Sequence, residues 1–356
     1  MVEHAAVIGI GAMGTVTAQI LAGNGIRVAL LARASEPVQE FFAGHENRRY
    51  LPGIPLSERI TPTNDPAVAF ERCGLIISAI PCQYLRGEWQ RHGPAVPPGV
   101  PIGSVTKGLE ISTGARPSQI IAEHVRGNPI GVLSGPNIAS ELARCLPATA
   151  VFASQTPAVA ELLQHALSTA WFRVYTSRDV LGVELAGALK NVIALAAGIL
   201  DGLRAGDNAK AALVTRGLVE ITRLGVALGA RPETFSGLAG VGDLITTSVS
   251  PHGRNRTAGQ RIGEGASVEQ IVRETPAVIE GIPTTRAVLM LAERHGVEMP
   301  ITRAVYDVLF EGKPPLVAIT ELMRRPPKAE DPRDACLSQP SSLSGRGRGR
   351  VETPGP

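Results

Sequence analysis

The feature that most constrains the fold of this 356-residue chain is a glycine-rich turn near its N-terminus. The sequence G-I-G-A-M-G at 9–14 follows the apolar run Ala5–Ile8 and opens a segment with apolar residues at helical spacing. In such a strand–turn–helix unit, Gly9 permits the tight turn, Gly11 lets the backbone approach a pyrophosphate, and Gly14 allows close helix–strand packing. The motif therefore predicts a dinucleotide-binding turn, with a glycine-rich turn that binds nothing as the alternative.

Short β-type runs alternate with helical patterns through the first half of the chain. This alternation predicts an α/β fold, with an N-terminal Rossmann-like, doubly wound and mostly parallel sheet covered by helices. From about Asp179 onward, Ala/Leu-rich segments take over and predict a C-terminal all-α domain. We expect strands at Ala5–Ile8, Arg27–Leu31, Leu75–Ile80, Val100–Val105, Ile130–Leu133, Thr149–Ala153 and Phe172–Tyr175. We expect helices at Val180–Leu203, Ala209–Leu228, Val268–Glu274, Thr284–His295 and Ile301–Glu311.

The chain divides by composition into three parts. We expect residues 1–178 to form a dinucleotide-binding domain and residues 179–325 to form a helical domain that holds the substrate and the catalytic group. Residues 326–356 contain six prolines, four glycines and four serines, and they include G-R-G-R-G-R, so they offer little apolar surface for burial. We expect this tail to be disordered, and RNA binding through its arginines is the less favoured alternative.

Composition excludes several classes of function. Lys and Arg number 35 against 32 Asp and Glu, and the resulting net charge of +3 is too small for a dedicated nucleic-acid surface. The four cysteines are widely spaced, the histidines show no metal-ligand spacing, and the most apolar segment contains Glu184, Lys190 and Asp201. We therefore expect a cytoplasmic protein without an export signal, a metal site or stable membrane insertion, and with no nucleic acid as partner.

The end of the second expected strand bears on the choice between NAD and NADP. NAD-preferring folds usually place an acid there to bind the ribose 2′-hydroxyl, whereas this strand ends in Ala-Arg33-Ala, with no acid before Glu36. Arg33 is suited to a charge-assisted pair with a 2′-phosphate, and the missing carboxylate removes the repulsion that excludes NADP. We predict that NADP is favoured and NAD tolerated, and an exposed arginine without a ligand is the alternative.

Lys190 is the strongest candidate for a catalytic side chain. It lies within an apolar helical segment, and its neighbours at helical spacing are all small: Ala186, Gly187, Ala194 and Ala197. A ligand can therefore approach the ammonium, and burial lowers the pKa of a lysine toward the range useful for moving a proton to or from an alcohol oxygen. The alternative is a lysine that extends to solvent or pairs with a carboxylate such as Asp243.

Polar loops follow two successive expected strands, at the edge where open α/β sheets bind ligands. T-K-G at 106–108 contains Lys107, and S-G-P-N at 134–137 follows the next strand. The helical half has two glycine-rich segments that we expect between helices. One is G-V-G-D at 240–243, which ends in Asp243, and the other is G-R-N-R at 253–256. An arginine and an amide at 254 and 255 are suited to holding a phosphate. Each segment alone also fits an ordinary turn or a basic surface loop.

These segments together resemble the bacterial-type NAD(P)-dependent glycerol-3-phosphate dehydrogenases over about residues 4–325. The motifs that carry the resemblance are G-I-G-A-M-G-T at 9–15, N-R-R-Y-L-P-G at 47–53, T-K-G-L-E at 106–110, S-G-P-N at 134–137, E-L-A-G-A-L-K-N-V at 184–192, G-V-G-D-L at 240–244, G-R-N-R at 253–256 and V-I-E-G at 278–281. The family is known for reversible hydride transfer between sn-glycerol 3-phosphate and dihydroxyacetone phosphate, which supplies the glycerol backbone of phospholipids. The resemblance implies a small phosphorylated substrate and a homodimer.

The resemblance also implies roles for individual residues. Lys190 is the general acid/base. The residues that contact the substrate are Lys190 itself and Lys107, Gly135, Asn137, Asp243, Arg254 and Asn255. Along the cofactor, the glycines of the turn, Gly9, Gly11 and Gly14, are joined by Ala12, Met13, Arg33, Lys107, Ala139, Arg254 and Glu280. The chain departs from the family pattern at four positions, with Met13 for an aromatic residue, Asn137 for a hydroxyl residue, Gly253 for serine and Ile138 for phenylalanine.

Two other functions fit part of the same pattern. A β-hydroxyacid dehydrogenase shares the Gly-x-Met-Gly turn but acts on a substrate that carries a carboxylate. A nucleotide-sensing protein keeps the fold and the cofactor site without turnover. The first predicts activity on hydroxy acids and none on glycerol phosphate, and the second predicts NADP binding without turnover of any triose phosphate.

Overall fold

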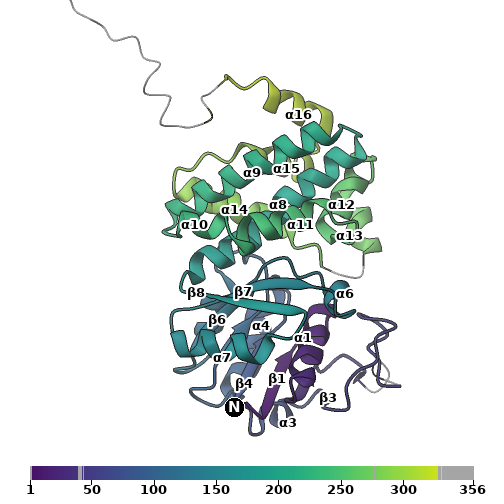
Figure 1. Cartoon of the computed structure of the whole chain (residues 1–356). Coiled ribbons are helices and arrows are strands. Elements are labelled where there is room, and N and C mark those ends of the chain that lie inside the picture. Colours follow the sequence, from purple (N-terminus) through teal and green to yellow (C-terminus); the bar gives the residue numbers. More distant parts are fainter. Residues whose placement is uncertain (1, 39–41, 43, 276–277, 328–329, 331–356) are drawn as a thin grey trace, which may run out of the picture.

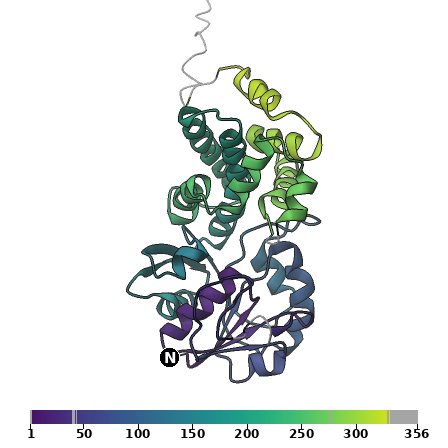
Figure 2. The same ribbon diagram turned by 90° about the vertical axis from the view of Figure 1, so that its right-hand side faces the viewer.

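The computed structural model describes residues 2–38, 42, 44–275, 278–327 and 330. These residues form a sheet domain and a helical domain stacked one on the other, as two views at right angles show (Figure 1 and Figure 2). The last strand ends at Ser177 and the first helix of the helical domain begins at Val180, and we place the domain boundary between them. The tail expected at 326–356 lies almost entirely outside the described residues.

The sheet domain contains eight strands in the order β3-β2-β1-β4-β5-β6-β7-β8. Their bounds are β1 His4–Ile8, β2 Arg27–Leu31, β3 Ile60–Thr63, β4 Leu75–Ser78, β5 Ile102–Ser104, β6 Ile130–Ser134, β7 Ala148–Ser154 and β8 Phe172–Ser177. Every neighbouring pair is parallel except β6 and β7. The predicted doubly wound, mostly parallel sheet is confirmed. The strands that follow β1 first extend the sheet on one side, as β2 and β3, and then on the other, from β4 onward. Sheets of this type bind ligands outside the carboxyl ends of the strands where the order reverses, here β1 and β4.

Strand β3 has no counterpart among the expected strands. The strand has the short sequence Ile-Thr-Pro-Thr, and only its first residue is buried. Proline lacks the N–H that a central strand needs, so a strand containing it is tolerated where one side is free. The structure places β3 at the edge of the sheet, beyond β2, which is such a position.

Helices cover both faces of the sheet. One face carries α1 (Ala12–Gly23), α6 (Ala139–Leu142) and α7 (Pro157–Leu167). The other carries α3 (Pro66–Phe70), α4 (Cys82–His92), the short turn η1 (Gly93–Ala95) and α5 (Pro117–Ala122). Ala5 and Val7 of β1 belong to the first core, and Ala6 and Ile8 belong to the second. Burial on both faces explains why β1 reads as a continuous apolar run rather than an alternating one.

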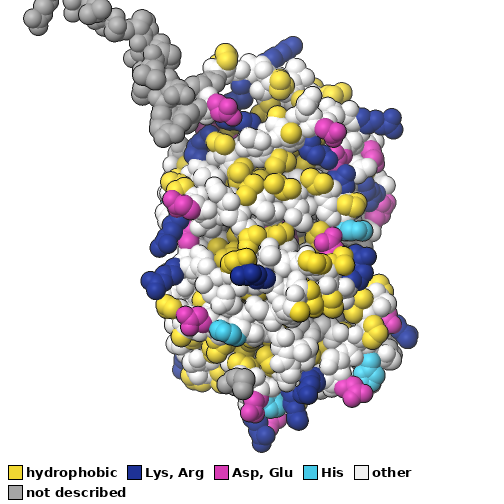
Figure 3. All heavy atoms as spheres, viewed as in Figure 1, with side chains coloured by type: hydrophobic (Ala, Val, Ile, Leu, Met, Phe, Trp, Pro, Cys, Tyr) yellow, Lys and Arg dark blue, Asp and Glu magenta, His cyan; other side chains and the backbone are white. Residues whose placement is uncertain are grey.

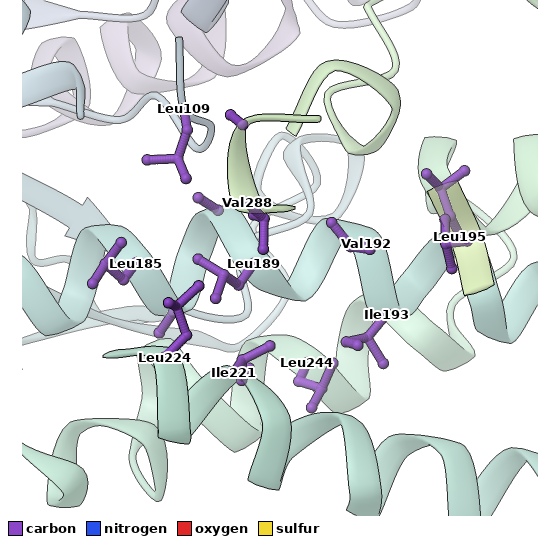
Figure 4. Packing of buried hydrophobic residues seen from close by; sticks show 14 of the residues in the cluster. Leu109, Leu185, Leu189, Val192, Ile193, Leu195, Ile221, Leu224, Leu244 and Val288 are labelled. Carbon is purple, nitrogen blue, oxygen red and sulfur yellow. The ribbon is translucent and has the colours of Figure 1, made fainter. Parts of the chain in front are cut away.

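The helical domain is organised around α8 (Val180–Gly202), in which every residue from Gly182 to Leu200 is buried. Leu189 packs with Leu224 and other apolar side chains of the neighbouring helices (Figure 4). Helix α8 is long and apolar enough to cross a membrane, but its most apolar 18-residue stretch is entirely buried, as in the core helix of a globular domain. The other helices are α9 Asp207–Ala227, α10 Pro232–Phe235, α11 Asp243–Val249, α12 Arg254–Gly263, α13 Val268–Glu274, α14 Gly281–Arg294, α15 Pro300–Phe310 and α16 Pro315–Met323.

Helix α12 lies very close to α8 because glycines line both sides of the contact. A Cβ on Gly198 of α8 would lie 1.9 Å from a carbonyl oxygen of α12, and a Cβ on Gly259 of α12 would lie 2.0 Å from a carbonyl oxygen of α8. Gly202 and Gly263 are crowded in the same way one turn further along. The two backbones therefore pack directly on each other, and this contact fixes where α12 begins relative to the middle of α8.

Two segments expected between helices are instead the first turns of helices. A π-helical turn, η2 (Leu238–Gly242), leads directly into Asp243, the first residue of α11. Arg254 is likewise the first residue of α12. Helix α12 is difficult to recognise in the sequence, because its buried face is narrow and includes a glycine and an asparagine in place of large apolar side chains. The apolar spacing that marks longer helices is too sparse there.

Candidate active site

The glycine turn between β1 and α1 has the backbone that an anion-binding turn requires. Gly9 has a φ of 108°, and a Cβ there would lie 2.7 Å from the carbonyl oxygen of Ala79. A Cβ on Gly14 would lie 1.9 Å from the Gly9 carbonyl oxygen, whereas the space in front of Gly11 is open. Because Gly11, the N-cap of α1, offers no side-chain cap, the first N–H groups of the helix are available to an anion. The turn fits the pyrophosphate of a dinucleotide.

Arg33, an expected cofactor contact, follows β2 with its side chain half exposed. Its guanidinium Nη2 donates to Glu36 Oε1 at 3.0 Å, and its backbone N–H donates to Glu36 Oε2 at 3.0 Å. The lack of an acid before Glu36 in the sequence does not leave Arg33 without a carboxylate neighbour, because a turn folds Glu36 back onto the arginine. The lack of repulsion, on which a preference for NADP rests, does not hold in this structure.

Lys107 and the loop after β6 meet at the carboxyl edge of the sheet, as expected from their places after successive strands. Lys107 Nζ donates to the Gly135 carbonyl oxygen at 3.0 Å and to Asn137 Oδ1 at 2.6 Å. A third hydrogen bond joins Lys107 Nζ to Asp243 Oδ2 at 2.7 Å. The amide Nδ2 of Asn137 is buried and has no hydrogen-bond partner among the described residues. Asn137 is one of the positions where the chain departs from the family that it resembles. Its Oδ1 holds Lys107 in place, and the N–H groups of its Nδ2 are available to a ligand.

Lys190 is buried in the middle of α8 and does not extend to solvent. Its Nζ donates to Asp243 Oδ1 at 2.6 Å and to Thr247 Oγ1. Burial lowers the pKa of Lys190 to about 8, although the negative charge of Asp243 opposes that shift. Extension of Lys190 to solvent is therefore excluded, whereas the pairing with Asp243 is present and lies beside the Lys107 cluster. The pairing alone does not separate a structural lysine from a catalytic one.

Asp243 joins the two lysines, one from each domain. It is 2% exposed, and each of its carboxylate oxygens accepts from one ammonium. Burial by itself would raise the pKa of Asp243, but the charges of Lys107 and Lys190 outweigh it and hold the pKa below its usual value. The carboxylate therefore stays ionised, and the cluster of two cations and one anion keeps a net positive charge.

Two site residues were not anticipated from the sequence. Thr247 accepts from Lys190 while its own hydroxyl donates to the Asp243 carbonyl oxygen at 2.7 Å. Asn191 Nδ2 lies 3.4 Å from the Lys107 carbonyl oxygen. The signal for Thr247 is its spacing, since it stands four residues after Asp243 and shares a helical face with it. That signal is readable only once α11 is recognised.

Arg254 and Asn255 open α12 and have different surroundings. Arg254 is accessible to solvent, yet protein surrounds it closely enough for desolvation to lower the pKa of its guanidinium, with Glu280 opposing the shift. The side chain of Asn255 is buried: its Nδ2 donates to Asn191 Oδ1 at 2.9 Å, and its Oδ1 accepts from the Gly281 N–H at 2.9 Å. Its amide therefore braces α8, α12 and α14 together, and its backbone N–H is the group it presents at the helix N-terminus.

Glu280, an expected cofactor contact, stands immediately before α14 and reaches the sheet domain. Its Oε1 accepts from the Cys82 N–H at 2.9 Å, and its Oε2 is buried without a hydrogen-bond partner among the described residues. Burial raises the pKa of Glu280 to about 7. A buried carboxyl oxygen that lacks a partner in the protein is available to a bound molecule.

The remaining expected contacts lie around the glycine turn. Ala12 and Met13 are the first two residues of α1, and Ala139 is the first residue of α6, which packs against α1. Ile138 is the N-cap of α6 and Gly253 the N-cap of α12. In the described part of the chain, no cluster of three or more His, Cys, Asp or Glu side chains is placed to hold a metal ion.

Comparison with known proteins identifies the family. Residues 4–160 match the model described as NAD-dependent glycerol-3-phosphate dehydrogenase N-terminus, and residues 179–320 match the corresponding C-terminus. The chain belongs to the NAD-dependent glycerol-3-phosphate dehydrogenase family. The resemblance inferred from the sequence is confirmed, and so is the prediction of an oxidoreductase that uses NAD or NADP.

Relatives match over nearly the whole chain. The glycerol-3-phosphate dehydrogenase (NAD(P)+) of Chlorobium phaeobacteroides is 46% identical over 327 residues, which cover 91% of this chain and 98% of that protein. The enzyme of the same name from Thermobifida fusca is 46% identical over 328 residues, again 91% and 98% of the two chains. A solved glycerol-3-phosphate dehydrogenase from Coxiella burnetii has a TM-score of 0.88 at 36% identity, covering 91% of this chain and 99% of that one.

Proposed function

We propose that the protein catalyses the reversible oxidoreduction of sn-glycerol 3-phosphate and dihydroxyacetone phosphate, with Lys190 as the general acid/base. The observation that carries the proposal is the buried pair of Lys190 and Asp243, 2.6 Å apart, at the edge of the sheet that also carries the glycine turn. A buried lysine with a lowered pKa suits proton transfer at an alcohol oxygen. Family membership supports the choice of substrate.

The residues present fit a nicotinamide dinucleotide. The open space at Gly11 and the N-terminus of α1 would hold the pyrophosphate. Arg33, at the end of β2, would face the adenosine ribose. When bound, the cofactor supplies or accepts the hydride. By family resemblance the other residues along it are Ala12, Met13, Lys107, Ala139, Arg254 and Glu280.

The substrate phosphate binds, in this proposal, at the N-terminus of α12. Arg254 offers a planar set of donors to the anion, and the N–H groups of the first turn add to them. Asn255 contributes its backbone N–H, because both ends of its side-chain amide are engaged in the protein. The close contact of α12 with α8 fixes this phosphate site relative to Lys190.

Lys190 moves the proton. In the reducing direction, protonated Lys190 donates from Nζ to the C2 oxygen of the substrate, and in the oxidising direction neutral Lys190 accepts the proton of the C2 hydroxyl. A pKa of about 8 keeps both forms within reach near neutral pH. Asp243 and Thr247 hold Nζ in place, and Lys107 adds a second positive charge that stabilises the developing alkoxide.

The proposal extends to the setting of the protein. Glycerol 3-phosphate formed in the reducing direction supplies phospholipid synthesis. A cytoplasmic location is supported by the three described cysteines, which are all free thiols. A homodimer is supported by apolar side chains on the surface of the helical domain, gathered in places on the face that Figure 3 shows. Val219 and Val226 of α9 and Leu316 and Met323 of α16 are exposed.

The test is oxidation of NADPH, and separately of NADH, by the purified protein with dihydroxyacetone phosphate. We expect turnover with this substrate and none with 2-oxo or 3-oxo acids, which lack the phosphate. Turnover on the acids alone would assign the chain to the β-hydroxyacid dehydrogenases instead. Cofactor binding by folded protein without turnover of any triose phosphate would favour a nucleotide sensor.

A further inference from the structure

A cluster of three side chains at the end of β2 bears on cofactor choice. Glu36 is 8% exposed, and its carboxylate accepts the two hydrogen bonds from Arg33 and a third from the Tyr50 hydroxyl at 3.2 Å. Burial by itself would raise the pKa of Glu36, but the hydrogen bonds and charge of Arg33 outweigh it and lower the pKa. The carboxylate is therefore ionised at neutral pH and balances the charge of Arg33.

Hydrogen bonds tie this cluster to the glycine turn. The Gly9 N–H donates to the Leu31 carbonyl oxygen at 2.9 Å, which joins the turn to the last residue of β2. Asn47 Nδ2 donates to the backbone of the turn at 2.8 Å, and Asn47 Oδ1 accepts from the Tyr50 N–H at 3.2 Å. In sheets of this type, the residues that follow the second strand face the adenosine ribose of a bound dinucleotide. The cluster thus lies where a 2′-hydroxyl or a 2′-phosphate is recognised.

The turn that carries the cluster is held from the side of β3. Asn64 Nδ2 donates to the Arg33 carbonyl oxygen at 2.6 Å and to the Glu36 carbonyl oxygen at 3.2 Å. The Glu36 N–H also donates to the Arg33 carbonyl oxygen at 3.0 Å. With its backbone fixed in this way and its side chain buried, Glu36 stays beside Arg33 when a ligand arrives.

We propose that Glu36 is a specificity-determining residue that keeps the discrimination between NADP and NAD small. A 2′-phosphate gains the guanidinium of Arg33 but meets the negative charge of Glu36, so part of the attraction is cancelled. A 2′-hydroxyl finds an acceptor, because a carboxylate has about four lone-pair sites and the described residues donate to three of them. This inference rests on the proposed function, since it concerns the cofactor site of the same enzyme.

The experiment measures the affinity of the full-length protein for 2′,5′-ADP and for 5′-AMP by calorimetry. These probes differ only in the 2′-phosphate and need no turnover. Glu36→Gln keeps the size of the side chain and removes its charge, and we expect the ratio of the two affinities to shift toward 2′,5′-ADP by about tenfold. Arg33→Met, at a half-exposed side chain, should shift the ratio the other way. Glu58→Gln, an exposed carboxylate before the amino end of β3, should leave it unchanged.

An unchanged ratio in Glu36→Gln, from protein with the wild-type circular dichroism spectrum, would overturn the inference while leaving the proposed function intact. If Glu36→Gln does not fold, the Arg33→Met result decides, and an unchanged ratio there overturns the inference equally. Failure of the wild-type protein to bind either probe, or NADP and NAD themselves, would overturn both the inference and the proposed function. A matching shift in the kcat/KM ratio for NADPH and NADH would support both.

Discussion

At the scale of single residues, Asp243 determines how the two lysines of the site are used. It holds Lys107 at 2.7 Å and Lys190 at 2.6 Å while almost fully buried. Because one carboxylate pairs with two ammonium groups, the cluster carries a net positive charge, which in the proposed reaction stabilises the developing alkoxide. Lys190 differs from Lys107 in being fully surrounded by protein, and that burial brings its pKa to about 8.

Replacing Arg254 with alanine should impair binding of the phosphorylated substrate. A charge-assisted contact to a phosphate is lost, so we expect kcat/KM for dihydroxyacetone phosphate to fall about 10- to 100-fold, chiefly through a higher KM. Steady-state kinetics measure this directly. Arg261→Ala removes a cation from the far end of the same helix and serves as the control. Unchanged kinetic constants in Arg254→Ala would remove this residue from the phosphate site.

Glu280 predicts a pH dependence of stability. Its pKa rises on folding from an ordinary value of 4.5 to about 7, so between these values the folded state holds a proton that the unfolded state has lost. Glu280 should therefore lower the free energy of unfolding by about 3 kcal/mol as the pH rises through this window. Glu280→Gln removes this contribution, so the free energy of unfolding of the variant should fall by about 3 kcal/mol less than that of the wild type over the same window. Urea unfolding at pH 5 and pH 8 measures the change in the free energy of unfolding of each protein. Equal changes in the wild type and in Glu280→Gln would contradict the assignment.

The sequence identifies residues whose chemistry is unusual for their position. Lys190 stands out as a cation within an apolar helix, and Lys107 follows a buried strand at the ligand-binding edge. Thr247 and Glu36 do not stand out, since threonine and glutamate are ordinary in helices and turns. Their roles come from side-chain directions that depend on the folded backbone: the first turn of α11 for Thr247, and the turn after β2 for Glu36.

At the scale of elements, the contact between α8 and α12 positions the proposed phosphate site. Burial along nearly the whole of α8 gives it a long apolar signature that is visible in the sequence. Helix α12 has no such signature, because its glycines take the place of the apolar side chains that usually mark a packed face. Its existence therefore could not be predicted from periodicity, although the arginine at its start was singled out.

A methyl group added to this contact should destabilise the protein. Gly259→Ala forces the backbones of α8 and α12 apart, and we expect a loss of about 1–3 kcal/mol or more in the free energy of unfolding, together with a higher KM for the phosphorylated substrate. Gly87→Ala is the matched control, because Gly87 lies in α4 with open space where the Cβ would be. That change should stabilise by about 0.5–1 kcal/mol. Urea denaturation compares the two, and equal effects would contradict the close contact.

At the scale of the whole molecule, the proposed active site combines residues of both domains. Lys107 comes from the sheet domain and Asp243 from the helical domain. A second ion pair, between the partly exposed Arg116 and the buried Glu184, crosses the same junction, and Ser118 adds hydrogen bonds of 2.7 Å to that carboxylate. These partners are 66 or more residues apart in the chain. The alternation of β and α segments predicts the two domains, but such long-range pairing is not readable from local patterns.

Homodimer formation is the prediction that belongs to this scale. Light scattering after size-exclusion chromatography should give about twice the chain mass of 37.3 kDa at micromolar concentration. Val226→Asp on α9 and Leu316→Asp on α16 place charges on the exposed apolar surface of the helical domain, and at least one should shift the equilibrium to the monomer. Val68→Asp, at a similarly exposed valine of the sheet domain, should not. A single-chain mass for the wild type would contradict the proposal.

The central claim is that Lys190 transfers the proton during reduction of dihydroxyacetone phosphate. The most direct measurement is kcat of Lys190→Ala in that reaction, made beside the affinity of the same variant for NADPH. Loss of a general acid should lower kcat by about 10²- to 10⁴-fold while cofactor affinity stays near the wild-type value. A kcat close to that of the wild type, from a variant that binds the cofactor normally, would contradict this role for Lys190.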